Sequence, residues 1–250
     1  MRRLWPPLVL LAVAVALWQL VVRAFGVQDY VFPAPTAVAA SFGRDFGLLG
    51  RATLVTLREV LLGFALAVVV ALAVAVLLHF SEALRRALLP ILVLSQTVPT
   101  VVLAPVLAIL LGYGLTPKLV VVAVVCFFPI VVNAVDGLRS ADRELILMMR
   151  TLHGGRLAIF RRVEWPGALP AIFSGARIAA TYAAVGAVFA EWAGSTSGLG
   201  FVMLQAQPAL ETDRIFAAVL ILSAIALGLY ALVTVAERMA VPWKAEAANA

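Results

Sequence analysis

Long stretches without a charged residue are the feature that most constrains the fold of this chain. Five stretches of 17 or more residues contain no Asp, Glu, Lys or Arg: 4–22, 60–81, 87–117, 119–135 and 215–236. A helix of about 20 apolar residues crosses a hydrocarbon core of about 30 Å. Each stretch is therefore long enough to span a bilayer as one helix.

A sixth span is predicted over residues 172–190, with Arg177 near its start, where a long side chain can reach the interface. The chain is 64% hydrophobic and 13% charged, whereas soluble domains carry about 25% charged residues. The sequence therefore predicts an all-α, polytopic membrane protein with six transmembrane helices, forming a single domain over residues 1–250. Cys126 has no partner for a disulfide and is expected to be a small core residue.

The N-terminal Arg2-Arg3 followed by an apolar run also resembles a signal peptide. The run is longer than the signal-peptide core of about 7–15 residues, and no clear cleavage site follows it. A retained first helix is therefore favoured.

The distribution of Lys and Arg predicts the orientation in the membrane. With a cytoplasmic N-terminus, twelve of the 19 Lys and Arg residues fall in cytoplasmic connections, six in outer ones, and Arg177 within the fifth span. This orientation places both termini and the segment 136–170 in the cytoplasm. The net charge of +6 is then a topology signal, and no nucleic-acid partner is predicted.

The segment 136–170 is basic and amphipathic, unlike the rest of the chain. Helical spacing separates an apolar stripe from a charged side. The stripe holds Leu145, Met148, Met149 and Leu152, and the charged side holds Arg143, Glu144 and Arg150. Gly154-Gly155 ends this helix, and a second short helix is predicted over 157–163. We interpret the segment as a docking site for a cytoplasmic partner; the alternative is a connector lying flat on lipid headgroups.

The third predicted span contains the polar sequence SQTVPT. Gln96, Thr97 and Thr100 place polar groups near mid-membrane, and Pro99 frees the carbonyl four residues earlier. An irregular backbone at this depth is tolerated where it is buried in protein or lines a water-filled cavity. These four residues are candidates for lining a substrate path, and the alternative is hydrogen bonding between helices.

Several kinds of chemistry have no signal in this sequence. His79 and His153 have no metal-ligand spacing around them, so no metal site is predicted. No glycine-rich loop is followed by Lys-Ser/Thr, and the GSTSGLG of residues 194–200 is expected to be a flexible outer turn. No predicted span carries a charged pair for proton coupling. The energy for any transport is therefore expected to come from a partner.

Several segments of the chain resemble those of a known family. RTLHGGRLAIFRRVEWPGALP, followed by SGARIA, resembles the signature loop of permease subunits of type I ABC importers, in the branch for nitrate, sulfonates, taurine and thiamine precursors. Other segments also resemble the family and stand in its order: FPAPTAV, LAPVLAILLGYG and FFPIVVNAVDGL before this loop, and AEWAGSTSGLG after it. The resemblance therefore covers nearly the whole chain.

The loop departs from the family pattern at its start. The usual Glu-Ala-Ala is replaced by Leu147, Met148 and Met149, and His153 stands at the usual glycine, with Gly154 one place later. The family's acidic anchor is therefore missing. Glu144 and Arg150 are the substitutes expected to make the polar contact.

The resemblance implies a homodimer in the cell inner membrane with two copies of a cytoplasmic ATPase and a periplasmic or lipid-anchored solute-binding protein. ATP would be bound by the ATPase, so this chain is expected to hold no cofactor and to be no enzyme. The expected ATPase-coupling residues are Glu144, Met148, Met149, Arg150, Leu152, His153, Gly154 and Arg156. Glu191, at the outer end of the fifth span, is expected to contact the binding protein or form the outer gate, or else to be a solvated helix end.

The substrate is predicted from the same resemblance. AEWAGSTSGLG and ETDRIFAAVLIL look most like members that carry the pyrimidine precursor of thiamine; sulfonate, taurine, nitrate or riboflavin permeases are the alternatives. The competing function class is a stand-alone secondary carrier or channel, which co-purification with an ATPase would exclude. A lipid-acting membrane enzyme would need a nucleophile or metal site that the sequence does not offer.

Overall fold

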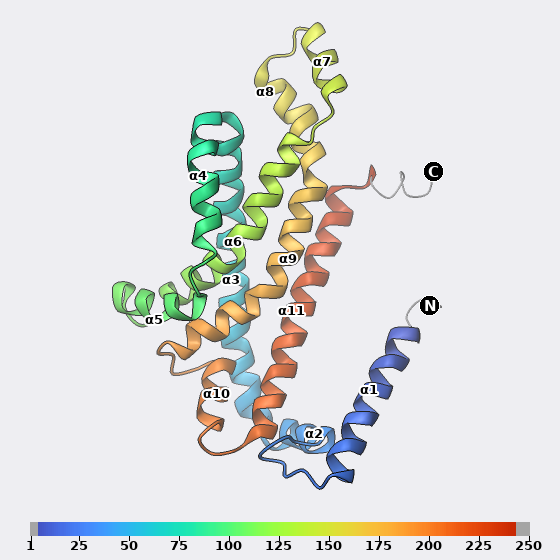
Figure 1. Cartoon of the computed structure of the whole chain (residues 1–250), viewed down its shortest axis with the longest axis vertical. Helices are drawn as coiled ribbons and strands as arrows, with labels where there is room; N and C mark the ends of the chain where they lie inside the picture. Colours follow the sequence, from blue (N-terminus) through green and yellow to red (C-terminus); the bar gives the residue numbers. More distant parts are fainter. Residues whose placement is uncertain (1–4, 244–250) are drawn as a thin grey trace.

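The computed structural model describes residues 5–243, apart from the side chain of Pro7 (Figure 1). Every regular element in this part of the chain is a helix. In chain order they are α1 (Trp5–Ala24), α2 (Pro35–Arg44), α3 (Phe46–Phe80), α4 (Glu82–Ser95), α5 (Thr100–Leu111), α6 (Leu115–Arg139), α7 (Arg143–Thr151), α8 (Arg156–Ile159), η1 (Phe160–Glu164), α9 (Trp165–Trp192), α10 (Leu199–Ala206) and α11 (Thr212–Ala240). The predicted all-α, polytopic fold is confirmed.

The number of spans stays a prediction. Among the described residues, four helices are long and apolar enough to cross a membrane: α3, α6, the continuous helix Arg156–Trp192 and α11. The pair α4 and α5 passes the same test together, which makes up to five. The first predicted span begins at residue 4, outside the described residues, and α1 contains a shorter apolar helix over Leu8–Ala24.

The third predicted span is wrong as a single helix. Most of residues 87–117 fall in α4 and α5, which are bent by 102°, and α5 leaves the bundle sideways in Figure 1. Pro99 is the extended N-cap residue of α5. Proline lacks an N–H and disfavours the helical conformation of the residue before it, and the chain has left the helix at Val98. The polar sequence marks a break in the span.

The second helix of the segment 136–170 is not a separate element. α8, η1 and α9 run on as one helix of 37 residues over Arg156–Trp192. In η1, the Trp165 N–H donates to the carbonyl of Phe160, five residues earlier, which makes one wide π-type turn. This turn precedes Pro166, whose ring conflicts with regular helix geometry. The loop therefore has one free helix, α7, and the first turns of a long helix.

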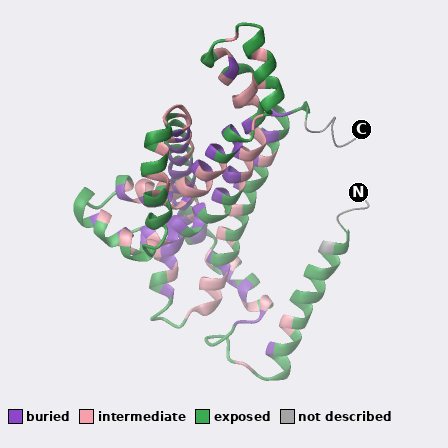
Figure 2. Cartoon of the chain, turned by 45° about the horizontal axis from the view of Figure 1, so that its top comes forward, coloured by how far each residue is buried: buried purple, intermediate pink, exposed green. Residues whose placement is uncertain are grey.

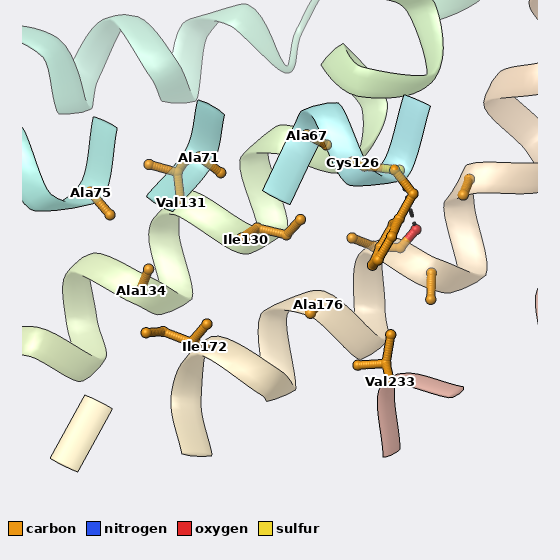
Figure 3. Packing of buried hydrophobic residues seen from close by; sticks show 14 of the residues in the cluster. Ala67, Ala71, Ala75, Cys126, Ile130, Val131, Ala134, Ile172, Ala176 and Val233 are labelled. Atoms are coloured by element: carbon orange, nitrogen blue, oxygen red, sulfur yellow. Dashed lines mark hydrogen bonds between the residues drawn. The ribbon is translucent and has the colours of Figure 1, made fainter. Parts of the chain in front are cut away.

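Small residues bring α3, α6 and α9 close together (Figure 3). Ala67, Ala71 and Ala75 recur every four residues on α3 and are fully buried. At Gly175 of α9, an added Cβ would lie 2.5 Å from the carbonyl oxygen of Pro129. Close helix contact through small side chains is typical of membrane bundles. Cys126 is buried here, with Sγ 3.4 Å from the Ala179 carbonyl, as expected.

The molecule has two distinct ends along its long axis (Figure 1). The loop end carries α7, the α3–α4 junction and the C-terminal end of α11; the far end carries α2 and α10. Helix α1 is largely exposed outside its contacts at the far end (Figure 2). There, Trp18 packs against Phe32 and Phe216 with ring centroids 5.6 and 5.7 Å away.

An ion-pair cluster fastens α11 to the α2–α3 junction at the far end. Arg214 Nη2 lies 2.9 Å from Asp45 Oδ1, and Arg44 Nη2 lies 2.7 Å from Asp213 Oδ2. The hydrogen bond from Arg214, with its positive charge, lowers the pKa of Asp45 below its ordinary value of 3.8. The cluster joins residues that are 169 positions apart in the sequence.

Candidate functional site

The free helix α7 is held by caps at both ends. Asp142 accepts a hydrogen bond from the Glu144 N–H at 2.8 Å, which satisfies one of the free donors of the first turn. At the other end, the N–H of His153 bonds to the Arg150 carbonyl at 3.0 Å and the N–H of Gly154 to the Met149 carbonyl at 2.8 Å. With φ +60 at His153, this pair of bonds is a Schellman motif.

The apolar stripe of α7 is largely free. Leu145, Met148 and Leu152 are 47%, 57% and 68% exposed. Met149 differs, because it is half-buried and its methyl group faces Gly154, where an added Cβ would lie 3.1 Å away. Three apolar side chains on one side of α7 and its C-cap residue thus form an exposed surface, which we call the α7 face.

The other predicted coupling residues surround the α7 face. Glu144, Arg150, His153 and Arg156 are exposed, and Gly154 is half-buried. A hollow of about 430 Å³ lies beneath the helix, and its lining includes Arg150, Gly154 and Arg156. Leu147 is 59% exposed but lies on a different side of α7 from Met148, so it was not part of the predicted stripe.

A group of contacts that no sequence pattern indicates attaches the loop to the end of α3. Arg156 donates to the Phe80 carbonyl at 3.0 Å, and its guanidinium lies 5.0 Å from the centroid of the Phe80 ring. His79 Nε2 lies 2.8 Å from Glu164 Oε2. The Phe160 ring packs against the rings of Phe80 and His79, with centroids 5.0 and 5.6 Å away. We call Phe80, Arg156, His79 and Glu164 the loop-end latch.

A cavity of about 520 Å³ lies where the α4–α5 break faces α6 and α9. Ligand sites typically enclose about 300–1,000 Å³. Of the four predicted path residues, Gln96 and Thr100 line this cavity. The other two are not among its lining residues: the Thr97 hydroxyl donates to the Leu94 carbonyl at 2.8 Å, and Pro99 caps α5. Asn133 and Tyr182 also line it and were missed, because helices remote in sequence bring them there.

Glu191 lies at the far end and is fully buried, so the alternative of a solvated helix end is wrong. Its Oε1 accepts from the Thr56 hydroxyl at 2.6 Å, and its Oε2 accepts from the N–H of Gly200. The Trp192 indole N–H donates to the Gly200 carbonyl at 3.0 Å. The turn over residues 194–200, which we call the glycine loop, is therefore fixed at several points and is not the flexible turn that its composition predicts.

Charged pairs join the helices at residues that, apart from Arg177, lie one position outside the predicted spans. Lys118 of α6 lies 2.6 Å from Glu59 of α3 and donates to Ser195 of the glycine loop at 2.7 Å. Arg177 of α9 pairs with Glu237 of α11. The absence of charged pairs in the predicted spans therefore gives no argument against a carrier.

The comparisons with known proteins agree on one family. The sequence model of the family described as "Binding-protein-dependent transport system inner membrane component" matches residues 63–244. A probable ABC transporter permease of Haemophilus influenzae is 40% identical, over 91% of this chain and 93% of the relative. A formylaminopyrimidine transport permease of Halalkalibacterium halodurans is 30% identical over 95% of both chains. A riboflavin transport permease of Chloroflexus aurantiacus is 38% identical, over 96% of this chain and 92% of the relative.

A solved structure shows the same fold. It is an inward-facing conformation of the MetNI methionine ABC transporter, with a TM-score of 0.68 and 20% sequence identity. The match covers 79% of this chain and 98% of that one.

Proposed function

Because the chain belongs to the family of binding-protein-dependent transport system inner membrane components, we propose that a cytoplasmic ATPase docks on its α7 face. The chain is a multi-pass ABC importer permease, in whose family ATP hydrolysis belongs to a separate subunit. The observation that carries the docking proposal is the row of exposed Leu145, Met148 and Leu152 on a capped helix. A partner with an apolar groove would bury this row, as grooves do with amphipathic helices.

The rest of the assembly follows from the same proposal. Two copies of this single-domain chain, each with its loop at 136–170, would form the membrane path, with two ATPase subunits on the loop side and a solute-binding protein at the far end. In this orientation both termini are cytoplasmic. The cavity that includes Gln96 and Thr100 would belong to the path. Closure of the ATPases would move α7 and, through the loop-end latch, α3.

The decisive experiment is co-purification from mild detergent after co-expression with the neighbouring genes. We expect an ATPase chain in equal amount with the wild type and its loss in Met148→Asp, which puts a charge on the α7 face. Leu210→Asp adds the same charge to an exposed leucine in the turn before α11, at the far end of the molecule, and serves as the control. Equal recovery with both variants would contradict docking on the α7 face, and transport by the purified chain alone would indicate a stand-alone carrier or channel.

For the substrate, we propose the pyrimidine precursor of thiamine, with a sulfonate, taurine, nitrate or riboflavin as alternatives. The support is the relative that carries formylaminopyrimidine; the riboflavin relative favours a different solute. Uptake of a labelled aminopyrimidine by cells that express the whole importer, in competition with riboflavin and taurine, tests this choice. No uptake of the aminopyrimidine, with uptake of labelled riboflavin by the same cells, would replace the pyrimidine with a flavin.

A further inference from the structure

The cavity at the α4–α5 break has a lining without charge. Its volume is about 520 Å³, and residues of α4, α5, α6, α9 and the break line it. The polar lining residues are Ser, Gln, Thr, Asn and Tyr, and none of the described residues that line it is Asp, Glu, Lys, Arg or His. An ionised solute would lose its water here without meeting an opposite charge, which is unfavourable.

The Asn133 side chain on α6 is held in one orientation. Its Nδ2 donates to the Pro129 carbonyl at 2.8 Å, and because a carbonyl oxygen only accepts, this bond fixes which end of the amide is the NH₂ group. Gly175 of α9 packs against the side chain, since an added Cβ there would lie 2.8 Å from Asn133 Cβ. The Asn133 oxygen and its second N–H have no hydrogen-bond partner within residues 5–243. Asn133 therefore offers a solute one fixed acceptor and one fixed donor.

Gln96 adds a second amide from the break. It is exposed, lines the same cavity and makes no side-chain hydrogen bond to the described residues. A primary amide can accept from an exocyclic amine while it donates to a nearby ring nitrogen, which is how Asn and Gln bind the edge of adenine. The same pairing suits other neutral nitrogen heterocycles that carry a donor beside an acceptor.

Two aromatic residues complete the lining. Tyr182 of α9 is 52% exposed, and Phe128 of α6 is half-buried. Aromatic side chains bind flat rings by offset stacking or by edge contacts. The cavity thus offers both kinds of contact that a flat heterocycle makes, polar ones at its edge and aromatic ones at its face.

The N-terminus of α5 also faces the cavity, through Thr100. Helix N-termini attract anions, but their partial charge is only about half a unit and does not balance a full negative charge. The Val102 N–H is already bonded to the Pro99 carbonyl at 3.0 Å. A ring nitrogen of a neutral heterocycle can accept from the N–H groups that are left.

We propose that this cavity selects an uncharged, flat nitrogen heterocycle, whose edge is bound by the amides of Asn133 and Gln96 and whose face packs against Tyr182. The proposal rests on the proposed function as an importer permease, and it makes this chain a second filter after the binding protein. It also separates the candidate solutes by their chemistry. An aminopyrimidine and a flavin suit the lining, whereas nitrate and the sulfonates, taurine included, do not.

Equilibrium binding to the full chain in lipid nanodiscs tests the cavity without a binding protein. The probes are a labelled aminopyrimidine and labelled methanesulfonate. We expect the wild type to bind the aminopyrimidine more tightly by about tenfold or more, the equivalent of one well-made hydrogen bond. Equal affinities, tighter binding of methanesulfonate, or no binding of the aminopyrimidine would overturn the proposal.

Two variants test whether the amides set this preference. Asn133→Leu keeps the shape of the side chain without its polar atoms, so aminopyrimidine binding should weaken about tenfold. Gln96→Arg adds a cation to the lining and should reverse the preference in favour of methanesulfonate. Gln205→Arg changes an exposed glutamine of α10 outside the cavity, and it should bind both probes as the wild type does. If Asn133→Leu does not fold, the two arginine variants still decide, and an unchanged preference in Gln96→Arg contradicts the proposal.

Uptake by cells that express the whole importer separates this proposal from the proposed function. If aminopyrimidine uptake is the same in the wild type, Asn133→Leu and Gln96→Arg, the permease function stands and the cavity is not selective. Uptake of methanesulfonate in place of the aminopyrimidine would overturn both the cavity proposal and the choice of substrate. Docking of the ATPase is decided independently, by its recovery with the chain.

Discussion

The two ends of α3 hold their neighbours in different ways. At the far end, Thr56 and Glu59 are buried and bind a network of fixed donors and acceptors. At the loop end, His79 and Phe80 are only half-buried, and the Arg156 that binds Phe80 is exposed. Water can replace a lost partner at the loop end but not at the far end, where an unpaired polar group keeps its full desolvation penalty.

This difference suits the proposed mechanism. The helix between the two ends is continuous, and about 20 residues at 1.5 Å each separate them by roughly 30 Å. A loop that must follow a moving ATPase needs contacts that exchange at low cost. The far end, which positions the glycine loop, needs contacts that do not exchange easily. We therefore expect equivalent substitutions to have larger effects on stability at the far end.

Gly198→Ala should produce the largest effect. The added Cβ would meet the buried Glu191 carboxylate, which Thr56 and the Gly200 N–H hold in place, and φ +106 is strained for alanine. We expect a loss of about 3 kcal/mol or more in the free energy of unfolding, measured by denaturant or thermal titration in detergent.

Gly155→Ala is the matched change at the loop end. Gly155 has φ −67 and nothing within 4 Å of an added Cβ, so only the weaker N-cap preference of alanine should matter, at a cost of about 1 kcal/mol or less. Similar losses in the two variants would mean that the two ends are equally rigid, and the comparison would fail.

Arg156→Ala tests the loop-end latch and should have an intermediate effect. The change removes the hydrogen bond to the Phe80 carbonyl and the contact with its ring, together worth about 1.5 kcal/mol. Arg161→Ala, an exposed arginine five residues further on, is the control and should be nearly neutral.

Hydrogen exchange locates the effect of Arg156→Ala. Amides of α8 and η1 should exchange faster in this variant, while those of the glycine loop should not change. Faster exchange at both ends would show that α3 transmits the disturbance even without an ATPase.

The long helices α3, α6, α9 and α11 and the α7 face could be read from the sequence, because both depend on local patterns of apolar residues. The break between α4 and α5 interrupts an uncharged stretch and could not be read in this way. The charged contacts could not. Glu59, Lys118, Glu191 and Glu237 each lie one residue beyond a predicted span, since the spans were defined by the absence of charge. In the structure the helices continue through these positions, and pairs of such residues meet between helices. Contacts such as Thr56 with Glu191, 135 residues apart, carry no signal in a single sequence.

Met149 shows the same limit at shorter range. Its spacing from Leu145 and Leu152 placed it on the stripe. The capping turn brings the chain back under the helix, so Gly154 covers this one side chain. Periodicity describes a helix alone and not the turn that packs against it. Met149→Asp is therefore expected to loosen the loop itself, which makes Met148→Asp the cleaner test of docking.

Acid sensitivity should also distinguish the ends, with a smaller effect than the substitutions above. The pKa of Asp45 is lowered by Arg214 at the far end. A group with a depressed folded-state pKa contributes stability above its ordinary value, here 3.8, and loses it as pH falls through the lower folded value. The wild type should therefore lose stability below about pH 4 more steeply than Asp45→Asn does. Equal slopes would show that the Asp45–Arg214 pair contributes no pH-dependent stability.

His153→Gly should have the smallest effect and the opposite sign. His153 occupies the C′ position of the Schellman motif at φ +60, where glycine is the usual residue because it has no Cβ to strain the backbone. Glycine should stabilise the turn by up to about 1 kcal/mol, whereas alanine should not. Because the loop end is loosely held, this gain should slow hydrogen exchange within α7 and leave the global unfolding midpoint nearly unchanged. If ATPase recovery falls in His153→Gly while exchange slows, the imidazole itself contacts the partner, and its role is more than that of a turn residue.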